Sequence, residues 1–144
     1  MRDNRGFGVL EVLFVVAIAA ILMAIAVPSF QRSTANYSVS TAADQLASEV
    51  QTARLLAATR NATFQMVFDT AKGTYQVTDP DDPDNPPRAQ KSLPSGVTFQ
   101  LAPASITFYS RGNTPGGAIQ IGNDKFSLRL TVKTTEITTE TVYQ

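Results

Sequence analysis

Apolar residues dominate the segment from Phe7 to Val27, and further along the chain they recur at a regular spacing. From Val12 to Val27 no residue is charged. The apolar segment from Phe7 to Val27 is about as long as a helix needs to cross hydrocarbon, roughly 20 residues. Pro28 follows, and a proline can kink a long helix without ending it, because only the hydrogen bonds near that turn are lost. The pattern predicts a membrane-spanning helix that continues with a kink at Pro28.

A second periodic stretch follows the polar segment 31–40. Its apolar residues alternate spacings of four and three, which is typical of an amphipathic helix. These residues are Val39, Ala43, Leu46, Val50, Ala53 and Ala57. The residues that supply the polar face are Gln45, Ser48, Glu49, Thr52 and Arg60. We therefore predict one long helix from about Phe7 to Arg60, with its first half in a membrane and its second half packed on a sheet.

From Asn61 onward the helical period gives way to alternation, which indicates strands. The strand-like segments are 63–68, 74–78, 97–101, 105–109, 118–121 and 126–132. Lys72-Gly73 reads as the turn of a hairpin, and the threonine-rich tail 134–142 suits an edge strand or a flexible end. Along the segment 126–132, alternation places four apolar residues on one face, which are Phe126, Leu128, Leu130 and Val132. The predicted fold class is α+β, a long N-terminal helix packed on an antiparallel β-sheet.

One acidic residue interrupts the start of the apolar segment. A carboxylate in a membrane helix costs about 2.5–3.5 kcal/mol at the bilayer centre and less near an end, so Glu11 calls for a functional explanation. Arg2 and Arg5 precede the segment and predict a cytoplasmic N-terminus, with everything after the helix outside. A simple signal anchor would need neither Glu11 nor the Gly6-Phe7 junction.

Gly6-Phe7, followed by Glu11 and an unbroken apolar helix, resembles the class III leader of type IV pilins and of type II secretion pseudopilins. The resemblance implies that a prepilin peptidase cleaves between Gly6 and Phe7 and N-methylates Phe7. It also implies that Glu11 is the family's assembly glutamate and that Pro28 stands where the helix leaves the bilayer. Gly8 departs from the pattern, in which a serine or threonine is usual.

The resemblance implies an organisation, a location and a set of partners. The organisation is a leader peptide at 1–6, a transmembrane assembly helix at 7–29, an amphipathic helix at 30–60 and a β-rich globular domain at 61–144. The protein is expected to be single-pass in the bacterial inner membrane, with the globular domain periplasmic or extracytoplasmic, and then to enter a filament. The expected partners are other pilins or pseudopilins, the prepilin peptidase and the inner-membrane assembly platform.

The chemistry of Glu11 supports this interpretation. Cleavage after Gly6 creates an amine at Phe7, one helical turn from Glu11 and at the same depth. In a packed filament, an incoming subunit's amine could pair with a neighbour's Glu11, which replaces two desolvation costs by one hydrogen-bonded pair. Our hypothesis is that Glu11 sets the register of the subunits.

A secretory signal peptide uses the same residues. A basic start, an apolar middle and Ala24-Ile25-Ala26 predict cleavage after Ala26, which would leave Val27 as the first residue. Glu11 within the apolar middle and a helical pattern that continues past the cut argue against this alternative.

Composition excludes several classes of function. The chain has no cysteine and no histidine, which excludes disulfides, thiolate or histidine zinc sites and the common catalytic triads. The 12 basic and 12 acidic residues balance, which argues against a strong grip on nucleic acid. We therefore expect no enzymatic activity and no cofactor.

Residues 79–87 form an acidic loop interrupted by prolines. Its carboxylates could hold calcium, which prefers oxygen ligands, and the resemblance makes this reasonable because major pseudopilins bind calcium in a loop. The loop lacks EF-hand spacing, and such loops are usually solvated, so the expected metal is none and calcium is the alternative. The carboxylates are Asp79, Asp81, Asp82 and Asp84.

The C-terminal half narrows the resemblance. The C-terminal half contains the segment 106–112, then a turn rich in small residues, and then paired strands. This order resembles the minor pseudopilin H and minor pilin FimT/FimU group. The turn contains Gly112, Gly116 and Gly117, which we interpret as positions that require positive φ. The implied function is a minor subunit at or near a filament tip.

The alternative function is a binding module on the filament, a receptor for DNA or for a secretion substrate. Some members of the group bind DNA through a basic C-terminal segment. Here the tail carries Glu136 and Glu140 with Lys133 as the basic residue nearby, and phosphate binding needs clustered cations. Binding to nucleic acid is therefore not expected.

Overall fold

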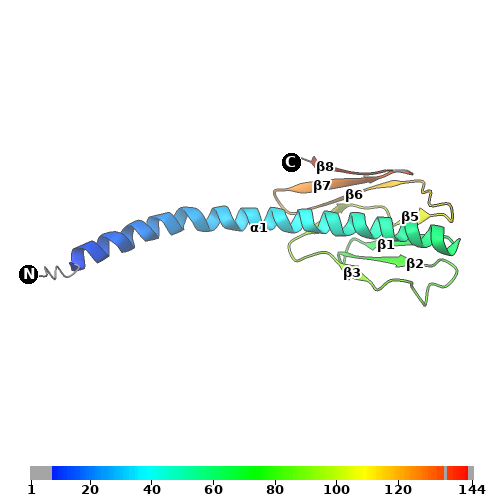
Figure 1. Ribbon diagram of the computed structural model, residues 1–144, viewed down its shortest axis with the longest axis horizontal. Helices are drawn as coiled ribbons and strands as arrows, with labels where there is room; N and C mark the ends of the chain where they lie inside the picture. The colour runs from blue at the N-terminus through cyan, green and yellow to red at the C-terminus, as the bar shows by residue number, and fades with distance from the viewer. Residues whose placement is uncertain (1–7, 135, 143–144) are drawn as a thin grey trace, which may run out of the picture. The chain divides into compact units, whose positions relative to one another are not determined.

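The computed structural model describes residues 8–134 and 136–142. Its one described helix, α1, runs through Val9–Arg60 (Figure 1). The chain divides into two compact units, Met1–Thr34 and Ala35–Gln144, and α1 contributes to both. The predicted helix is confirmed from Val9 onward, whereas Phe7 lies outside the described residues.

The end of α1 shows why the helix stops at Arg60. Asn61 has φ 49°, the left-handed conformation that asparagine tolerates better than most residues. The N–H of Ala62 then donates to the carbonyl of Ala57 at 3.2 Å, which is the six-to-one bond of a Schellman cap. This cap turns the chain back toward the sheets.

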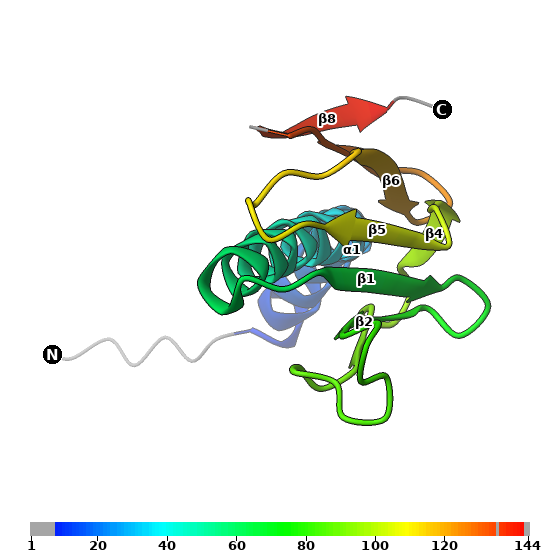
Figure 2. The ribbon, with the colours of Figure 1, turned by 90° about the vertical axis from the view of Figure 1, so that its right-hand side faces the viewer.

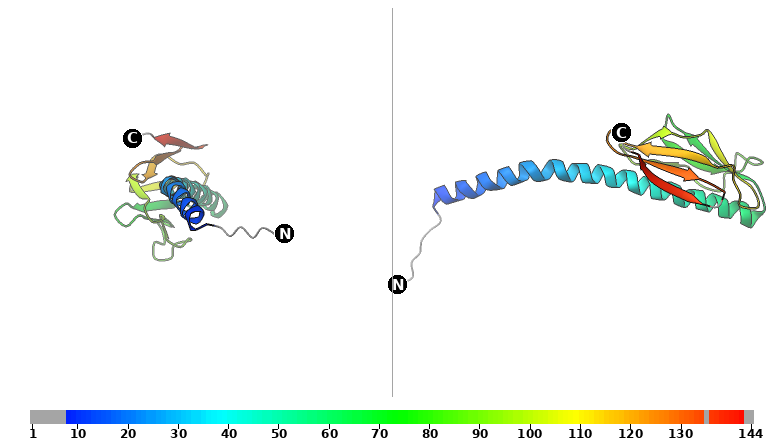
Figure 3. Two further views of the ribbon diagram at one scale, coloured as in Figure 1. Left: turned by 90° about the vertical axis from the view of Figure 1, so that its left-hand side faces the viewer. Right: turned by 90° about the horizontal axis from the view of Figure 1, so that it is seen from above.

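Eight described strands form two antiparallel sheets of four strands each. The first sheet has the order β3-β2-β1-β5 and the second the order β4-β6-β7-β8. In Figures 1 and 3, β6, β7 and β8 lie side by side, as their pairing requires. The strands are β1 Phe64–Asp69, β2 Thr74–Thr78, β3 Lys91–Ser92, β4 Thr98–Leu101, β5 Ser105–Phe108, β6 Gly117–Gly122, β7 Ser127–Val132 and β8 Ile137–Val142.

The fold class is confirmed, with two sheets where the sequence predicted one. The predicted hairpin pairs β1 with β2 and places Phe68 opposite Tyr75. β4 and β5 are neighbours in the chain but belong to different sheets, because β5 pairs with β1. Alternation along a strand predicts which face is buried, but it does not say which strand lies alongside.

The hydrophobic core lies between the second half of α1 and both sheets (Figure 2). Every residue of the predicted apolar stripe on α1 is at most 1% exposed, so the stripe is confirmed. The predicted face of β7 is confirmed as well, since Leu128, Leu130 and Val132 are buried and Phe126 packs against the core. The largest fully buried side chains are Phe64, Phe108, Leu46, Met66, Ile106, Ile119, Ile121 and Leu130.

The three glycines between the end of β5 and the start of β6 serve two purposes. Gly112 and Gly116 have φ of 76° and 86°, as predicted. The prediction is wrong for Gly117, whose φ is not in the positive range. A Cβ on Gly117 would lie 3.1 Å from Cδ1 of Ile106, so this glycine permits close packing between the sheets.

Candidate functional site

The first unit presents an unusual helical surface. Over Val9–Val27, α1 is the one helix in the described chain that is long and apolar enough to cross a membrane, and none of this segment is buried. Large apolar side chains point in every direction, with exposures from 50% at Val12 to 79% at Val9. A helix that is apolar all round needs an apolar environment, which is lipid or the helices of other subunits.

Small residues follow one line of this surface. Ala17, Ala20 and Ala24 are three and four positions apart, so they lie on one face of α1, and all three are exposed. Small side chains at this spacing let helices approach closely in lipid or in a bundle. The segment therefore offers a face suited to contact with another helix.

Glu11 lies in the first turn of α1 and is exposed. The first turn is held by Gly8, whose carbonyl accepts the N–H of Glu11 at 2.9 Å and that of Val12 at 3.2 Å. A carboxylate at this position is favoured by the positive end of the helix dipole. The structure thus places one anionic group at the start of an otherwise apolar helix.

The other predicted features of this unit stay predictions. Gly6 and Phe7, the cleavage and methylation residues, lie outside the described residues. Pro28 lies within α1, which continues to Arg60. The kink expected there and the register role of Glu11 are not tested by this structure.

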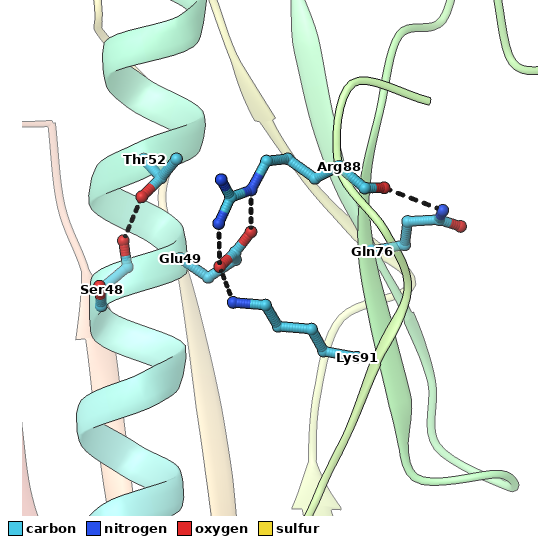
Figure 4. A network of polar contacts seen from close by, with 6 residues as sticks. All are labelled: Ser48, Glu49, Thr52, Gln76, Arg88 and Lys91. Carbon is cyan, nitrogen blue, oxygen red and sulfur yellow. Dashed lines mark hydrogen bonds and ion pairs between the residues drawn. The ribbon is translucent and has the colours of Figure 1, made fainter. Parts of the chain in front are cut away.

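The second unit contains an ion-pair cluster that the sequence interpretation missed. Glu49 was assigned to the polar face of the amphipathic helix, and this is wrong, because the residue is only 3% exposed. Its carboxylate receives two cations from the chain beyond β2 (Figure 4). Arg88 Nε donates to Oε1 at 2.9 Å, Arg88 Nη2 donates to Oε2 at 3.3 Å, and Lys91 Nζ also donates to Oε2.

A signal for this cluster exists in the sequence. Glu49 stands three residues after Leu46 and four before Ala53, so it shares the face of the buried stripe. A carboxylate at such a position needs a cation, because an unpaired buried charge is costly. Arg88 and Lys91 follow the proline-rich loop, but only the fold shows that this loop returns to α1.

The ion pairs favour the charged forms of Glu49 and Arg88. Burial raises the pKa of Glu49, but the hydrogen bonds and charges of Arg88 and Lys91 outweigh it, so this pKa lies below its ordinary value. The hydrogen bond to Glu49 raises the pKa of Arg88, and burial followed by the Glu49 charge raises that of Tyr75. An ionised carboxylate held by two cations is suited to fixing a structure rather than to transferring protons.

Each end of the cluster is anchored in a different element. The backbone of Arg88 is held by β2, because its carbonyl accepts a hydrogen bond from Gln76 Nε2 at 3.1 Å (Figure 4). Lys91 belongs to β3, one of the two edge strands of the first sheet. The cluster therefore ties α1 to the β2–β3 connection.

A second arginine ties α1 to the other sheet. Arg54 Nη2 donates to the carbonyl of Lys133, in the turn between β7 and β8, at 2.7 Å. The side chain of Arg54 also passes Gly112, where a Cβ would lie 3.7 Å from its Cγ. Glu49 and Arg54 thus fasten the two sheets to opposite flanks of one helix.

The acidic loop forms its own local structure. The backbones of Asp79 and Asp82 form an isolated antiparallel β-bridge. The Asp79 carboxylate accepts a hydrogen bond from the N–H of Asp81 at 3.0 Å. Within the described residues, no group of three or more acidic, histidine or cysteine side chains is placed to hold a metal ion. The calcium alternative, which also involves Asp84, stays a prediction.

The tail forms β8 and exposes both of its acidic residues. Glu136 stands in the β7–β8 turn and Glu140 in β8, and Lys133 precedes them. DNA binding through this segment would need a cluster of cations. The DNA-receptor alternative therefore gains no support from the tail.

These features define a class of protein. An exposed apolar helix with a single acidic residue at its start, continuous with a helix covered by a β-domain, is the architecture of pilin-like subunits. Sequence comparison agrees at both ends of the chain. Residues 1–27 match the prokaryotic N-terminal methylation motif, and residues 42–136 match the family described as type II transport protein GspH. The chain belongs to the GspH family, which confirms the resemblance found in the sequence.

Two solved structures share the fold. The minor pseudopilin EpsH from the type 2 secretion system of Vibrio cholerae is 14% identical with a TM-score of 0.56, over 74% of this chain and 97% of that one. The type IV minor pilin FimU of Pseudomonas aeruginosa (strain PAO1) is 15% identical with a TM-score of 0.59, over 71% of this chain and 87% of that one. Comparison with curated protein sequences finds no match.

Proposed function

We propose that the protein is a structural minor subunit of a type IV pilus or of a type II secretion pseudopilus. The observation that carries the proposal is the apolar segment Val9–Val27, exposed on all sides, with Glu11 at its start. Such a segment has an apolar environment in the inner membrane before assembly and among other subunits afterwards. In this role the protein is a building block and not an enzyme, as is typical of pilins.

Processing by the prepilin peptidase is part of the proposal. The peptidase cleaves between Gly6 and Phe7 and methylates Phe7, in line with the methylation motif matched over residues 1–27. Arg2 and Arg5 keep the leader in the cytoplasm, and the domain that follows α1 lies outside. The inner-membrane assembly platform then receives the mature subunit, and a minor subunit is expected at or near the tip.

Glu11 directs the assembly step. The carboxylate costs free energy when it lies alone in an apolar environment, and so does the amine of Phe7 in a neighbouring subunit. Pairing the two satisfies both charges at one depth, and this fixes how far one helix slides along another. The small-residue face formed by Ala17, Ala20 and Ala24 allows the close approach that such pairing requires.

The variant Glu11→Ala tests this mechanism. We expect cleavage and membrane insertion to be unchanged, because the Gly6-Phe7 junction and the apolar segment are intact, whereas incorporation into filaments should fall at least about tenfold, as expected when a buried charge loses its partner. The measurement is the amount of variant in sheared filaments relative to the amount in membranes.

Two control variants sharpen the result. Glu11→Asp keeps the carboxylate and should restore part of the incorporation. Asp84→Ala removes an exposed carboxylate of the acidic loop and should assemble normally. Normal incorporation of Glu11→Ala would show that Glu11 does not direct assembly.

A further inference from the structure

The four edges of the two sheets differ in how they are protected. Edge strands expose unpaired backbone groups, and proteins usually blunt them with short length, bulges, proline or lysine. β3 has two residues and includes Lys91, and β4 has four with a register shift between Phe99 and Leu101. β5 has four residues and begins two positions after Pro103. Each of these three edges carries at least one protective feature.

β8 is the exception. It has six residues that pair in unbroken register with β7, from Ile137 opposite Val132 to Val142 opposite Ser127. Its sequence ITTETV is β-branched at every position except Glu140 and contains neither proline nor lysine. β-branched residues favour the extended conformation. The strand is therefore well suited to pairing on its free side.

The register identifies the backbone groups on that free side. Lys133 N–H donates to the Glu136 carbonyl at 2.8 Å, so these two residues form a hydrogen-bonded pair. In an antiparallel ladder, hydrogen-bonded and non-hydrogen-bonded pairs alternate. The backbone groups of Ile137, Thr139 and Thr141 consequently point away from β7. Within the described chain, no strand other than β7 pairs with β8.

The edge is also held in place. Arg54 Nη2 binds the carbonyl of Lys133 at the base of the β7–β8 turn, and Ile137 packs against the core. At the other end, Ser127 Oγ donates to the carbonyl of Val142 at 3.1 Å. A strand fixed at both ends loses little conformational freedom when another strand is added, which favours binding.

We propose that β8 is a docking edge that accepts an extended segment of another polypeptide chain, with a basic residue opposite Glu140. Glu140 is exposed, and its neighbour on the β7 side is Arg129. On the free side a cation would complete the row of alternating charges, and opposite charges on paired strands stabilise a sheet. Backbone hydrogen bonds would provide affinity and the charge pair would provide specificity.

A second copy of this chain fits the edge poorly. In antiparallel β8–β8 pairing through the outward groups, the residue opposite Glu140 always has an even number between 134 and 142. Those residues are Thr134, Glu136, Thr138, Glu140 and Val142, and none of them is basic. The chemistry therefore favours a partner with a different sequence. The inference goes beyond assembly through α1, because it uses a different surface.

The test uses the purified full chain in detergent micelles and two fluorescent peptides. One peptide alternates valine and threonine around a central lysine, and the other has glutamate in place of the lysine. We expect saturable binding of the lysine peptide by fluorescence anisotropy, about two- to fivefold weaker binding of the glutamate peptide, and slower amide exchange at Thr139 and Thr141 in the complex.

Two substitutions on β8 separate strand addition from other binding. Thr139→Pro removes an outward N–H without removing a bond to β7, and proline is tolerated in an edge strand at such a position. It should weaken binding at least about tenfold, since both a donor and the approach of the added strand are lost. The matched control Thr139→Val keeps the N–H and should bind normally. Glu140→Lys leaves the backbone intact and should make the glutamate peptide the tighter ligand.

Three results would overturn the proposal. The first is equal binding to Thr139→Pro and to the unaltered chain while the amides of β7 keep their protection from exchange. The second is the absence of saturable binding by either peptide. The third is self-association of the chain that Thr139→Pro abolishes, since the occupant would then be a second copy. None of them bears on Glu11, so the assembly mechanism succeeds or fails separately.

Discussion

Replacing Arg88 and Lys91 together by methionine is expected to destabilise the folded domain by about 3 kcal/mol, because the buried carboxylate of Glu49 loses both cations at once. The Glu49 side chain is 4% exposed, whereas those of Arg88 and Lys91 are 39% and 43% exposed. Water can therefore reach the cations in part. For this reason we expect a loss of stability at the lower end of the range of about 3–5 kcal/mol for broken buried ion pairs. The measurement is urea unfolding of the full chain in detergent micelles, followed by amide exchange of β1 and β7.

A third substitution distinguishes a stranded charge from lost packing. Adding Glu49→Leu to the double variant removes the carboxylate and should restore most of the stability, since apolar residues commonly replace buried ion pairs at little cost. If the triple variant is no more stable than the double variant, the carboxylate is not the cause.

Acid should act on the same cluster. The pKa of Glu49 is lower in the folded than in the unfolded chain, so its stabilisation is fully present above the ordinary glutamate pKa and is lost as pH falls through the folded-state pKa. As the pH falls from the ordinary glutamate pKa through the folded-state pKa of Glu49, the unaltered chain should lose more stability than the triple variant.

The second large effect is expected at Gly116. A Cβ there would lie 2.6 Å from the carbonyl oxygen of Val132, and the backbone of β7 cannot move aside easily. Together with the strain of φ 86°, Gly116→Ala should destabilise the domain by about 3 kcal/mol.

Gly96 provides a matched control for the glycine prediction. Its φ is 82°, close to that of Gly116, but a Cβ would meet nothing within 4 Å. Gly96→Ala should therefore cost only the backbone strain, about 1 kcal/mol. Equal losses for the two variants in urea unfolding would show that the contact with Val132 does not matter.

Local periodicity predicted the elements of the fold that depend on nearest neighbours. The stripe from Val39 to Ala57 identified the buried face of α1, and the alternation of β7 identified its core side. Periodicity could not predict that β5 pairs with β1 rather than with β4, its neighbour in the chain. This pairing places Met66 opposite Ile106. Which distant strands pair depends on the packing of the whole domain, and the local pattern does not record it. The two-residue strand β3 is too short to show alternation.

Of the acidic residues in the candidate site, one was found from the sequence and one was missed. Glu11 was evident from sequence because a carboxylate stands out at the start of an apolar segment. Glu49 was missed because a carboxylate on an amphipathic helix is ordinarily solvated, and its partners lie 39 and 42 residues away in the chain. A charge that is exceptional locally can be found from sequence, whereas one that is explained by distant residues needs the fold.

Mass analysis of the amino terminus of the membrane-bound protein tests the central claim most directly. An assembly subunit retains its apolar helix after maturation, so we predict a chain that begins with N-methylated Phe7 and remains in the membrane. A secreted protein would lose that helix. A chain that begins at Val27 and is recovered free of the membrane would contradict the account.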